Sequence, residues 1–319
     1  MRIALAGDTM LGRTVADRLL DVGPAGLFAP EIVEITRDAD AFVLNLECCI
    51  SERGEPWPDP NKPFFFRAPP IAVDVLTLLG VDVVTLANNH ALDFGYDALA
   101  DTVEIVRSAG IRTVGAGRDL TEARSSTVVD IDGTSFEVIG VADHPADFAA
   151  TDDRPGIAYA DLWSGAVPTW LTDAVAAAHA RSDVALVTPH WGPNMVPRPL
   201  PHVRTAARAF VDAGADLVAG HSAHVFHGLA RPVLFDMGDF IDDYAVDPVL
   251  RNDLGVFFVV DVDADGLHRV EAIPIFLDYC FTRLAVADEW SWIARRYVEA
   301  CAEFGTEVTV EDGRLVTTW

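Results

Sequence analysis

Long hydrophobic runs are missing from this sequence, and so is a secretory leader. No stretch approaches the roughly 18 uninterrupted apolar residues that a membrane span requires. The chain opens with MRIALAGDTM, which passes from the first Met into an apolar run without a basic region, a long apolar segment or a cleavage site. These absences predict a soluble, cytoplasmic protein without a membrane anchor.

Basic residues are also scarce. Lys and Arg number 23 against 49 Asp and Glu, which gives a formal net charge of −26. A surface of this sign repels nucleic acid and anionic membranes, and no basic cluster reverses it. The charge therefore predicts no nucleic-acid partner, whereas it is compatible with metal ions or positively charged partners.

Cysteine is the third scarce component. The four cysteines, Cys48, Cys49, Cys280 and Cys301, do not form the pair of pairs typical of a structural zinc site. In a reducing cytosol we expect them to be buried thiols.

Half of the 319 residues are hydrophobic, which is enough for a sizeable core. Strand-like and helix-like segments alternate in the first half of the chain, as is typical of a parallel α/β sheet. The expected strands are Ile3–Ala6, Ala41–Asn45, Val81–Leu86 and Ile111–Val114, and the expected helices are Thr14–Val22, Ile71–Leu79 and Tyr96–Ala109.

The second half contains further expected strands, at Val184–Thr188 and directly before His221, and also hairpin signals. Asp132-Gly133 and Asp265-Gly266 each separate two β-like runs, and a helix at about Glu289–Glu303 closes the chain. One mostly parallel sheet and one hairpin-rich sheet fit an α/β fold of the four-layer αββα sandwich type. No linker divides the chain, so we expect a single domain over 1–319 that ends in a helix and short strands at about 284–319.

Five polar motifs each follow a predicted strand. They contribute Asp8 (AGDTM), Glu47 (LNLE), Asn88, His90 and Asp93 (LANNHALDFG), His190 (VTPHWG), and His221 and His224 (GHSAH). The carboxyl ends of strands in an open α/β sheet face a common crevice, so these side chains can converge although they are remote in sequence.

The residue types of these motifs favour a metal site. Oxygen and nitrogen donors without thiolate suit Mn²⁺, Fe²⁺, Zn²⁺ or Mg²⁺, and two ions that share a carboxylate can activate a water molecule. Each motif has a structural alternative. Asp8 could cap a helix and Glu47 could be a surface charge. Asn88 could belong to a turn and His190 to the core. Five such motifs at strand ends together favour the metal site.

The order GD-x-M, NLE, NNH-x-x-D-x-G, H-W-G, GH-x-x-H and a final GDF resembles the CapA family of poly-γ-glutamate biosynthesis-type proteins. The resemblance covers about Ile3 to Val260. It implies the fold of calcineurin-like metallophosphoesterases, a metallo-dependent phosphatase-like sandwich with two divalent metal ions at its edge.

The resemblance also implies the ligands of both ions. They are Asp8, Glu47, Asn88, His190, His221 and His224. Glu47 would lie between the two ions, Asp8 and His224 would hold one ion, and the other three residues would hold the second.

The implied catalytic residue is His90, which would act on the substrate as an acid or base and would be oriented by Asp93. A base on the Asp8 side is the alternative. His227, the third histidine of its loop, is expected to lie beside the site or on the surface. His144 and His202 receive no role.

Three further residues are expected to contact the substrate. Trp191 and Arg198 lie in the proline-rich stretch that follows His190, and Asp239 belongs to the final GDF. Asp239 stands where the family commonly has Asn, and Met10 stands where phosphoesterases usually have His. These departures predict poor activity on phosphate esters.

The favoured interpretation is a binuclear metal-dependent enzyme that acts on a peptide or polyglutamate-type substrate by hydrolysis or transfer. Three alternatives remain open at this point: epimerisation at a peptide α-carbon, phosphoester chemistry, and a non-catalytic accessory protein that binds polyglutamate.

Overall fold

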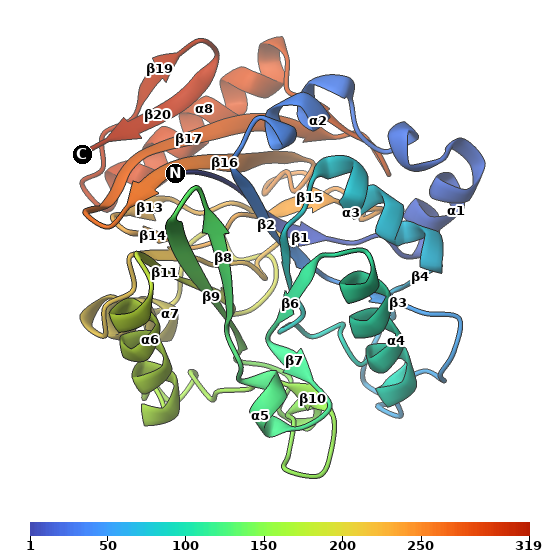
Figure 1. Ribbon diagram of the computed structural model, residues 1–319. Coiled ribbons are helices and arrows are strands. Elements are labelled where there is room, and N and C mark those ends of the chain that lie inside the picture. The colour runs from blue at the N-terminus through green and yellow to red at the C-terminus, as the bar shows by residue number, and fades with distance from the viewer.

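The computed structural model describes residues 1–319, and two large β-sheets dominate it (Figure 1). The first sheet has the strand order β19-β20-β17-β16-β1-β2-β5-β6, with β15 paired to β1 and β18 paired to β17. Its strands are β1 (Arg2–Thr9), β2 (Ala41–Leu46), β5 (Val83–Thr85), β6 (Arg112–Val114), β15 (Asp239–Ile241), β16 (Leu254–Asp263), β17 (Gly266–Leu277), β18 (Thr282–Leu284), β19 (Thr309–Glu311) and β20 (Arg314–Thr318).

The second sheet has the order β13-β14-β12-β11-β9-β8. Its strands are β8 (Thr127–Ile131), β9 (Thr134–Ala142), β11 (Val184–His190), β12 (Leu217–Ala219), β13 (Leu229–Ala230) and β14 (Val233–Leu234). Two small ribbons complete the β-structure and pair β3 (Cys49–Ile50) with β4 (Arg67–Ala68) and β7 (Ala116–Gly117) with β10 (Gly156–Ile157).

Helices cover the outer faces of both sheets. Those on the first sheet are α1 (Arg13–Val22), α2 (Pro30–Arg37), α3 (Val73–Leu79) and α4 (Gly95–Ser108). The second sheet carries α6 (Thr169–Arg181) and α7 (Pro201–Asp212), as Figure 1 shows. The remaining helices are α5 (Leu120–Ala123), α8 (Ala287–Ala302) and three short 3-10 turns, Pro24–Gly26, Pro70–Ala72 and Ala146–Phe148.

Three hydrophobic cores lie between the four layers, and the alternation of side chains along the strands explains them. In β1, Ala4 and Ala6 face the helices of the first sheet, whereas Ile3 and Leu5 face the second sheet. In β11, Leu186 faces inward. The neighbouring strand residues of β11 pack against α6 and α7 in the third core. The layer order αββα expected from the sequence is therefore confirmed.

Most predicted elements are present with shifted ends. The turn at Asp132-Gly133 has positive φ at both residues, 53° and 86°, as a two-residue hairpin of this type requires. The helix expected from Ile71 begins at Val73, because Pro70–Ala72 forms a 3-10 turn. Helix α2 was not anticipated, and neither was the parallel pairing of β15 with β1. All four cysteines are free and buried, as expected.

The strand directions bring the two sheets to one edge. Strands β1, β2, β5 and β6 are parallel to one another, and so are β9, β11 and β12. The carboxyl ends of both sets meet, because Asp8 of β1 lies 3.9 Å from His190 of β11. The predicted site residues belong to this edge.

Candidate metal centre

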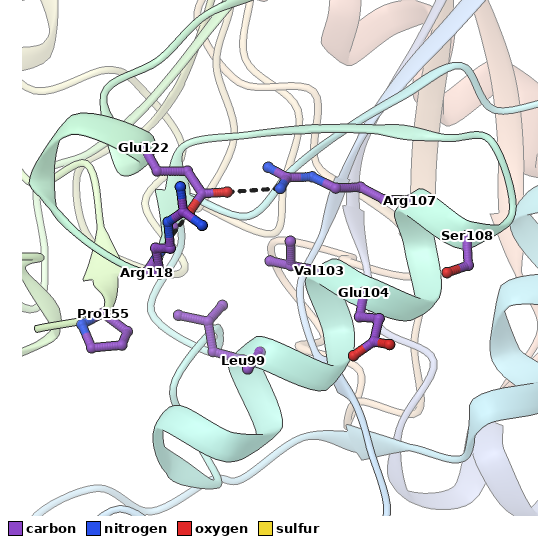
Figure 2. Close-up of a pocket in the computed structure, with 10 residues that line it drawn as sticks. Leu99, Val103, Glu104, Arg107, Ser108, Arg118, Glu122 and Pro155 are labelled. Carbon is purple, nitrogen blue, oxygen red and sulfur yellow. Dashed lines mark hydrogen bonds and ion pairs between the residues drawn. The ribbon is translucent and has the colours of Figure 1, made fainter.

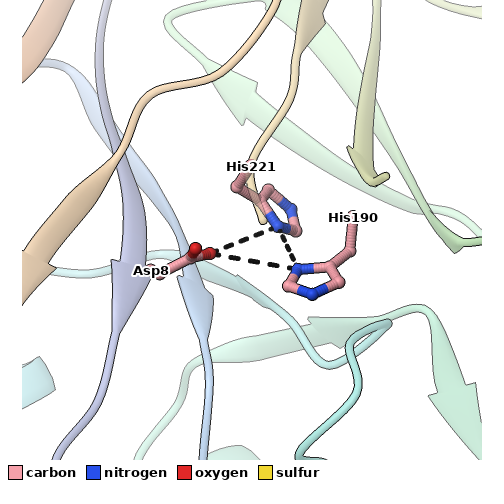
Figure 3. A group of neighbouring side chains, drawn as sticks. All are labelled: Asp8, His190 and His221. Atoms are coloured by element: carbon pink, nitrogen blue, oxygen red, sulfur yellow. Dashed lines mark hydrogen bonds and ion pairs between the residues drawn. The ribbon is translucent and has the colours of Figure 1, made fainter. Parts of the chain in front are cut away.

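One group of side chains joins the two sheets at this edge. Asp8 Oδ1 lies 3.5 Å from Nδ1 of His221 and 3.9 Å from Nδ1 of His190 (Figure 3). The two Nδ1 atoms are 2.8 Å apart, and His221 Nε2 lies 3.0 Å from the hydroxyl of Thr188. With its proton on Nε2, His221 directs the free electron pair of Nδ1 toward Asp8 and His190.

A second group adjoins the first and shares Asp8 with it. Its members are Asp8, Glu47, His224 and Asp239, all buried. His224 Nδ1 lies 3.2 Å from Asp8 Oδ2 and 2.8 Å from Asp239 Oδ1. Each oxygen of the Asp8 carboxylate thus faces a different group. Glu47 also reaches both groups, since its Oε1 lies 3.8 Å from His190 Nε2.

Several buried atoms of the two groups that could ligate a metal ion have no hydrogen-bond partner. They are both carboxylate oxygens of Glu47, Nε2 of His190 and Oδ2 of Asp239. A buried polar atom without a partner is costly, and a buried carboxylate is costlier still. Divalent cations would satisfy these atoms with carboxylate and imidazole ligands, so the residues fit metal ions.

The electrostatics of the two groups fit the same interpretation. Burial, reinforced by the negative charge of Asp8, raises the pKa of Glu47 well above its ordinary value. Burial lowers the pKa of His221 to about 4, and it lowers the pKa of His190 as well. Burial opposes a charge on His224 too, but the carboxylates of Asp239 and Glu47 outweigh it and raise the pKa of His224. The site therefore combines buried carboxylates with two imidazoles, His190 and His221, that burial keeps neutral and with one, His224, that neighbouring carboxylates favour in its protonated form.

Asn88 lies beside the groups, but both ends of its amide are engaged. Its Nδ2 donates to Asn45 Oδ1 and to the carbonyl of Leu46, each at 2.9 Å, and its Oδ1 accepts from the backbone N–H of His90 at 3.0 Å. Asn45, which the sequence analysis did not select, donates to Asp8 Oδ1 at 2.7 Å. The two asparagines thus fix the orientation of Asp8.

His90 and Asp93 form a pair next to the second group. His90 Nδ1 lies 2.6 Å from Asp93 Oδ2, which leaves Nε2 free, and burial lowers the pKa of His90 to about 4. Asp93 also accepts from the backbone N–H of Phe66 at 2.6 Å and pairs with Lys62 Nζ at 2.9 Å. Lys62 is the only lysine in the chain. Three donors therefore hold Asp93 in place behind His90.

A pocket of about 340 Å³ opens over His90 and His224. Its walls include Phe64, Phe66 and Tyr244. Phe66 stacks on the His90 ring at 3.9 Å between centroids, and Tyr244 meets the His224 ring edge-on at 5.1 Å. The pocket therefore gives a substrate access to both histidines.

Two residues expected at the substrate lie elsewhere, and we correct both interpretations. Trp191 is buried in the third core, where its ring stacks on Phe210 and its N–H donates to the carbonyl of Phe235 at 2.8 Å. Arg198 is 70% exposed and pairs with Glu303 at 3.0 Å, at the end of α8. Neither residue lines the pocket.

Asp239 is also reassigned. It was expected to contact the substrate, but its carboxylate is buried within the second group and binds His224. The register of β15 against β1 places it directly beside Asp8. This position makes Asp239 a candidate metal ligand.

A second histidine–carboxylate pair, missed by the sequence analysis, flanks the first group. Asp143 and His144 follow β9, the strand beside β11, and His144 Nδ1 lies 2.5 Å from Asp143 Oδ1. The His144 ring lies 5.1 Å from that of His190. His202 lies 3.6 Å from the other oxygen of Asp143. The strand-end rule that selected the five motifs also applies to Asp143 and His144.

His227 stays outside both groups. Its Nε2 lies 2.8 Å from the carbonyl of Val196, and its ring is buried. It thus ties the loop after β12 to the loop after β11, which is a structural role.

Another hollow, of about 460 Å³, lies between α4 and the segment that carries α5 (Figure 2). Leu99 and Val103 form its floor, and an ion pair of 2.7 Å joins Arg107 to Glu122. None of the predicted site residues belongs to it.

The four-layer αββα fold thus places histidine–carboxylate groups at its strand ends, in a site that is compatible with metal binding. The chain belongs to the family described as bacterial capsule synthesis protein PGA_cap, whose profile matches residues 2–244. The resemblance to CapA proteins expected from the motifs is therefore confirmed.

Curated relatives support the same family. A probable polyglutamine synthesis accessory protein of Mycobacterium tuberculosis is 33% identical over 294 residues, which are 87% of this chain and 76% of the relative. The PGA biosynthesis protein CapA of Bacillus subtilis is 27% identical over 292 residues, which are 86% of this chain and 74% of the relative.

Among solved structures, a hypothetical protein from Thermus thermophilus is similar with a TM-score of 0.43 and 17% identity, over 89% of this chain and 96% of that one. The sulfate thiohydrolase SoxB from Thermus thermophilus, in complex with glycerol, has a TM-score of 0.42 and 13% identity, over 85% of this chain and 55% of that one. Similarity at this level decides nothing about the site. None of the helices is both long and apolar enough to cross a membrane.

Proposed function

We propose that this protein is a metal-dependent enzyme that cleaves an amide bond of a glutamyl-type peptide, either by hydrolysis or by transfer of the acyl group to another acceptor. One observation carries the proposal. Buried atoms that could ligate a metal ion but have no hydrogen-bond partner converge beside a pocket, and they belong to Glu47, His190 and Asp239. The pocket is lined by His90, which pairs with Asp93. The names of the relatives supply the substrate class.

In this proposal two divalent ions are held by the two groups around Asp8. His190 and His221 would hold one ion, Glu47, His224 and Asp239 would hold the other, and Asp8 would serve both. This differs from the assignment implied by the resemblance, which placed Glu47 between the ions and included Asn88, whose Oδ1 here accepts the backbone N–H of His90. Bound ions of this kind polarise a carbonyl oxygen and lower the pKa of a bound water molecule. The set of donors suits Mn²⁺, Fe²⁺ or Zn²⁺ better than Mg²⁺, because imidazole contributes half of it.

His90 is the proposed proton carrier. Asp93 accepts the hydrogen of Nδ1, which leaves the electron pair of Nε2 directed away from Asp93 and able to take a proton. Returning that proton to the leaving nitrogen would complete the cleavage of an amide. Lys62 and the backbone of Phe66 keep Asp93 from turning away from His90.

A binding protein without catalysis is the second candidate, because the Mycobacterium tuberculosis relative is named an accessory protein. The pocket would then hold a glutamyl chain without cleaving it. Phosphoester chemistry receives less support, since Met10 and Asp239 replace the usual His and Asn and since Asp242 adds another buried carboxylate. Such carboxylates would repel a transferred phosphoryl group.

The first test uses mass spectrometry of a γ-glutamyl oligomer incubated with protein reconstituted with Mn²⁺. We expect metal-dependent cleavage or transfer, and His90→Asn should slow it by about 100-fold or more while the metal content stays unchanged. His179→Asn is the matched control, because His179 lies on α6 with 52% of its side chain exposed.

The outcomes separate the candidates. Binding of the oligomer without any change in mass, and without deuterium uptake in D₂O, would favour the accessory protein. Deuterium uptake at an α-carbon without cleavage would indicate epimerisation. Full turnover by His90→Asn would exclude the role proposed for His90.

A further inference from the structure

Arg13 is the only lysine or arginine among the residues that line the pocket over His90 and His224. It is the first residue of α1, and its φ of +50° lies in the left-handed region, which residues other than glycine rarely adopt. Unusual backbone conformations of this kind concentrate at binding and catalytic sites, where the surrounding structure maintains them. The backbone here directs a guanidinium to the pocket.

Aromatic rings and one carboxylate hold the Arg13 side chain. Its guanidinium carbon lies 5.7 Å from the centre of the Phe64 ring and 5.4 Å from that of Phe66. Nη2 pairs with Asp243 Oδ1 at 3.0 Å, and 36% of the side chain remains exposed. The ion pair involves Nη2 alone, and a guanidinium has five N–H donors, so donors remain available to a second acceptor.

Asp243 does not depend on Arg13 alone. Its Oδ2 accepts the backbone N–H of Thr14 at 3.0 Å, in the first turn of α1. The Asp243 carboxylate therefore keeps the Thr14 N–H as a hydrogen-bond partner when Arg13 also binds a ligand. Arginine suits such sharing, because its planar fork binds carboxylates in a defined geometry.

We propose that Arg13 binds the free carboxylate of a glutamyl residue of the substrate and thereby selects anionic over neutral chains. The inference rests on the function proposed above and names the group that recognises the substrate. Phe64 and Tyr244 line the same pocket and can pack against the methylene groups between the carboxylate and the amide bond. Asn194, an exposed residue of the lining, can bind the amides of the chain.

The test is a binding measurement that does not depend on turnover. A fluorophore-labelled γ-glutamyl pentamer is titrated with protein loaded with Mn²⁺, in the His90→Asn background so that the probe is not consumed. The comparison probe is the same pentamer with its free carboxylates converted to amides. The variants are Arg13→Gln, Arg13→Lys and, as matched control, Arg18→Gln, which removes an arginine of the same helix that does not line the pocket.

Arg13→Gln should weaken binding of the anionic pentamer by about tenfold to a hundredfold, the scale of one charge-assisted hydrogen bond. Arg13→Lys should lie between it and the parent, because lysine keeps the charge but not the fork. Arg18→Gln should bind like the parent, and the amidated pentamer should show no difference between the variants. Asp243→Asn should tighten binding of the anionic pentamer, because it frees Arg13 from its competitor.

Equal affinity of Arg13→Gln and the parent for the anionic pentamer would overturn the inference and leave the proposed function intact. Loss of affinity for both pentamers alike would also overturn it. If the metal-loaded parent binds neither pentamer, the glutamyl substrate itself is wrong. Should Arg13→Gln fail to fold, unchanged affinity in both Arg13→Lys and Asp243→Asn would overturn the inference.

Discussion

Asp8 is the residue on which both groups of the candidate metal centre depend. Asn45 binds its Oδ1 and the backbone N–H of Ser222 binds its Oδ2, so the carboxylate is fixed with one oxygen toward each group. Burial alone would raise its pKa, but the hydrogen bond and the charge of His224 outweigh burial and lower the pKa of Asp8. Asp8 is therefore held as an anion that two cations can share.

His227 allows a test of burial at the scale of one residue. Burial lowers its pKa from 6.5 to about 4, so folding favours the neutral ring. A depressed histidine pKa contributes stability that is complete above the unfolded value and is lost as the pH falls toward the folded value. Between about pH 7.5 and about pH 5, the wild type should lose about 2 kcal/mol more stability than His227→Gln.

The measurement is urea unfolding of both proteins at the two pH values, with equal metal content. Glutamine can still donate to the carbonyl of Val196, so the neutral contact is kept. The same pH dependence in wild type and variant would show that His227 does not titrate in this range.

Strand β15 is the element that completes the second group. It pairs with β1 in parallel, with Asp8 opposite Asp239, and the Asp8 N–H donates to the carbonyl of Gly238 at 2.9 Å. This close approach requires Gly7, because a Cβ at that position would lie 2.0 Å from the Gly238 oxygen. A small residue in β1 thus allows two carboxylates to adjoin.

Gly7→Ala should separate β15 from β1. The overpacking should cost about 1–3 kcal/mol, and the displacement of Asp239 should remove at least one metal ion. Thermal unfolding and metal analysis measure the two effects. Gly305→Ala is the control, since no atom lies within 4 Å of a Cβ there, and it should keep its metals despite the strain of a φ of 73°. Full metal content in Gly7→Ala would exclude this role of β15.

Local patterns predicted most strand ends and therefore most of the residues that meet at the site. Asp8, Glu47 and His190 each follow or end a buried strand, and parallel strands bring such positions to one edge. The position of Trp191 in the core could also have been predicted. Successive side chains of an extended chain point in opposite directions, so Trp191 points away from the site toward which His190 points.

The role of Asp239 was beyond local patterns. Its position depends on pairing between strands from opposite ends of the chain, and sequence periodicity contains no information on such pairing. The same holds for Arg198, which reaches Glu303 through a long loop, and for Arg13, whose direction follows from a positive φ.

The molecule as a whole is strongly acidic, and its candidate metal centre contains several buried carboxyl groups. The formal net charge is −26, and the buried carboxylates of Glu47, Asp239 and Asp242 all have pKa values raised first of all by burial. A fold that keeps such groups together needs cations to balance them. Binding of metal ions should therefore stabilise the folded protein.

The number of metal ions per chain tests the proposed two-metal centre most directly. Protein reconstituted with Mn²⁺ and freed of excess metal should contain about two ions, as expected for a centre with a shared carboxylate. Glu47→Gln should lose at least one ion, Asp8→Asn should lose both, and the exposed Asp74→Asn should keep both. Chelation should lower the melting temperature of the wild type. If the wild-type protein binds no transition metal and its melting temperature is unchanged by chelator, the groups around Asp8 do not form a metal centre.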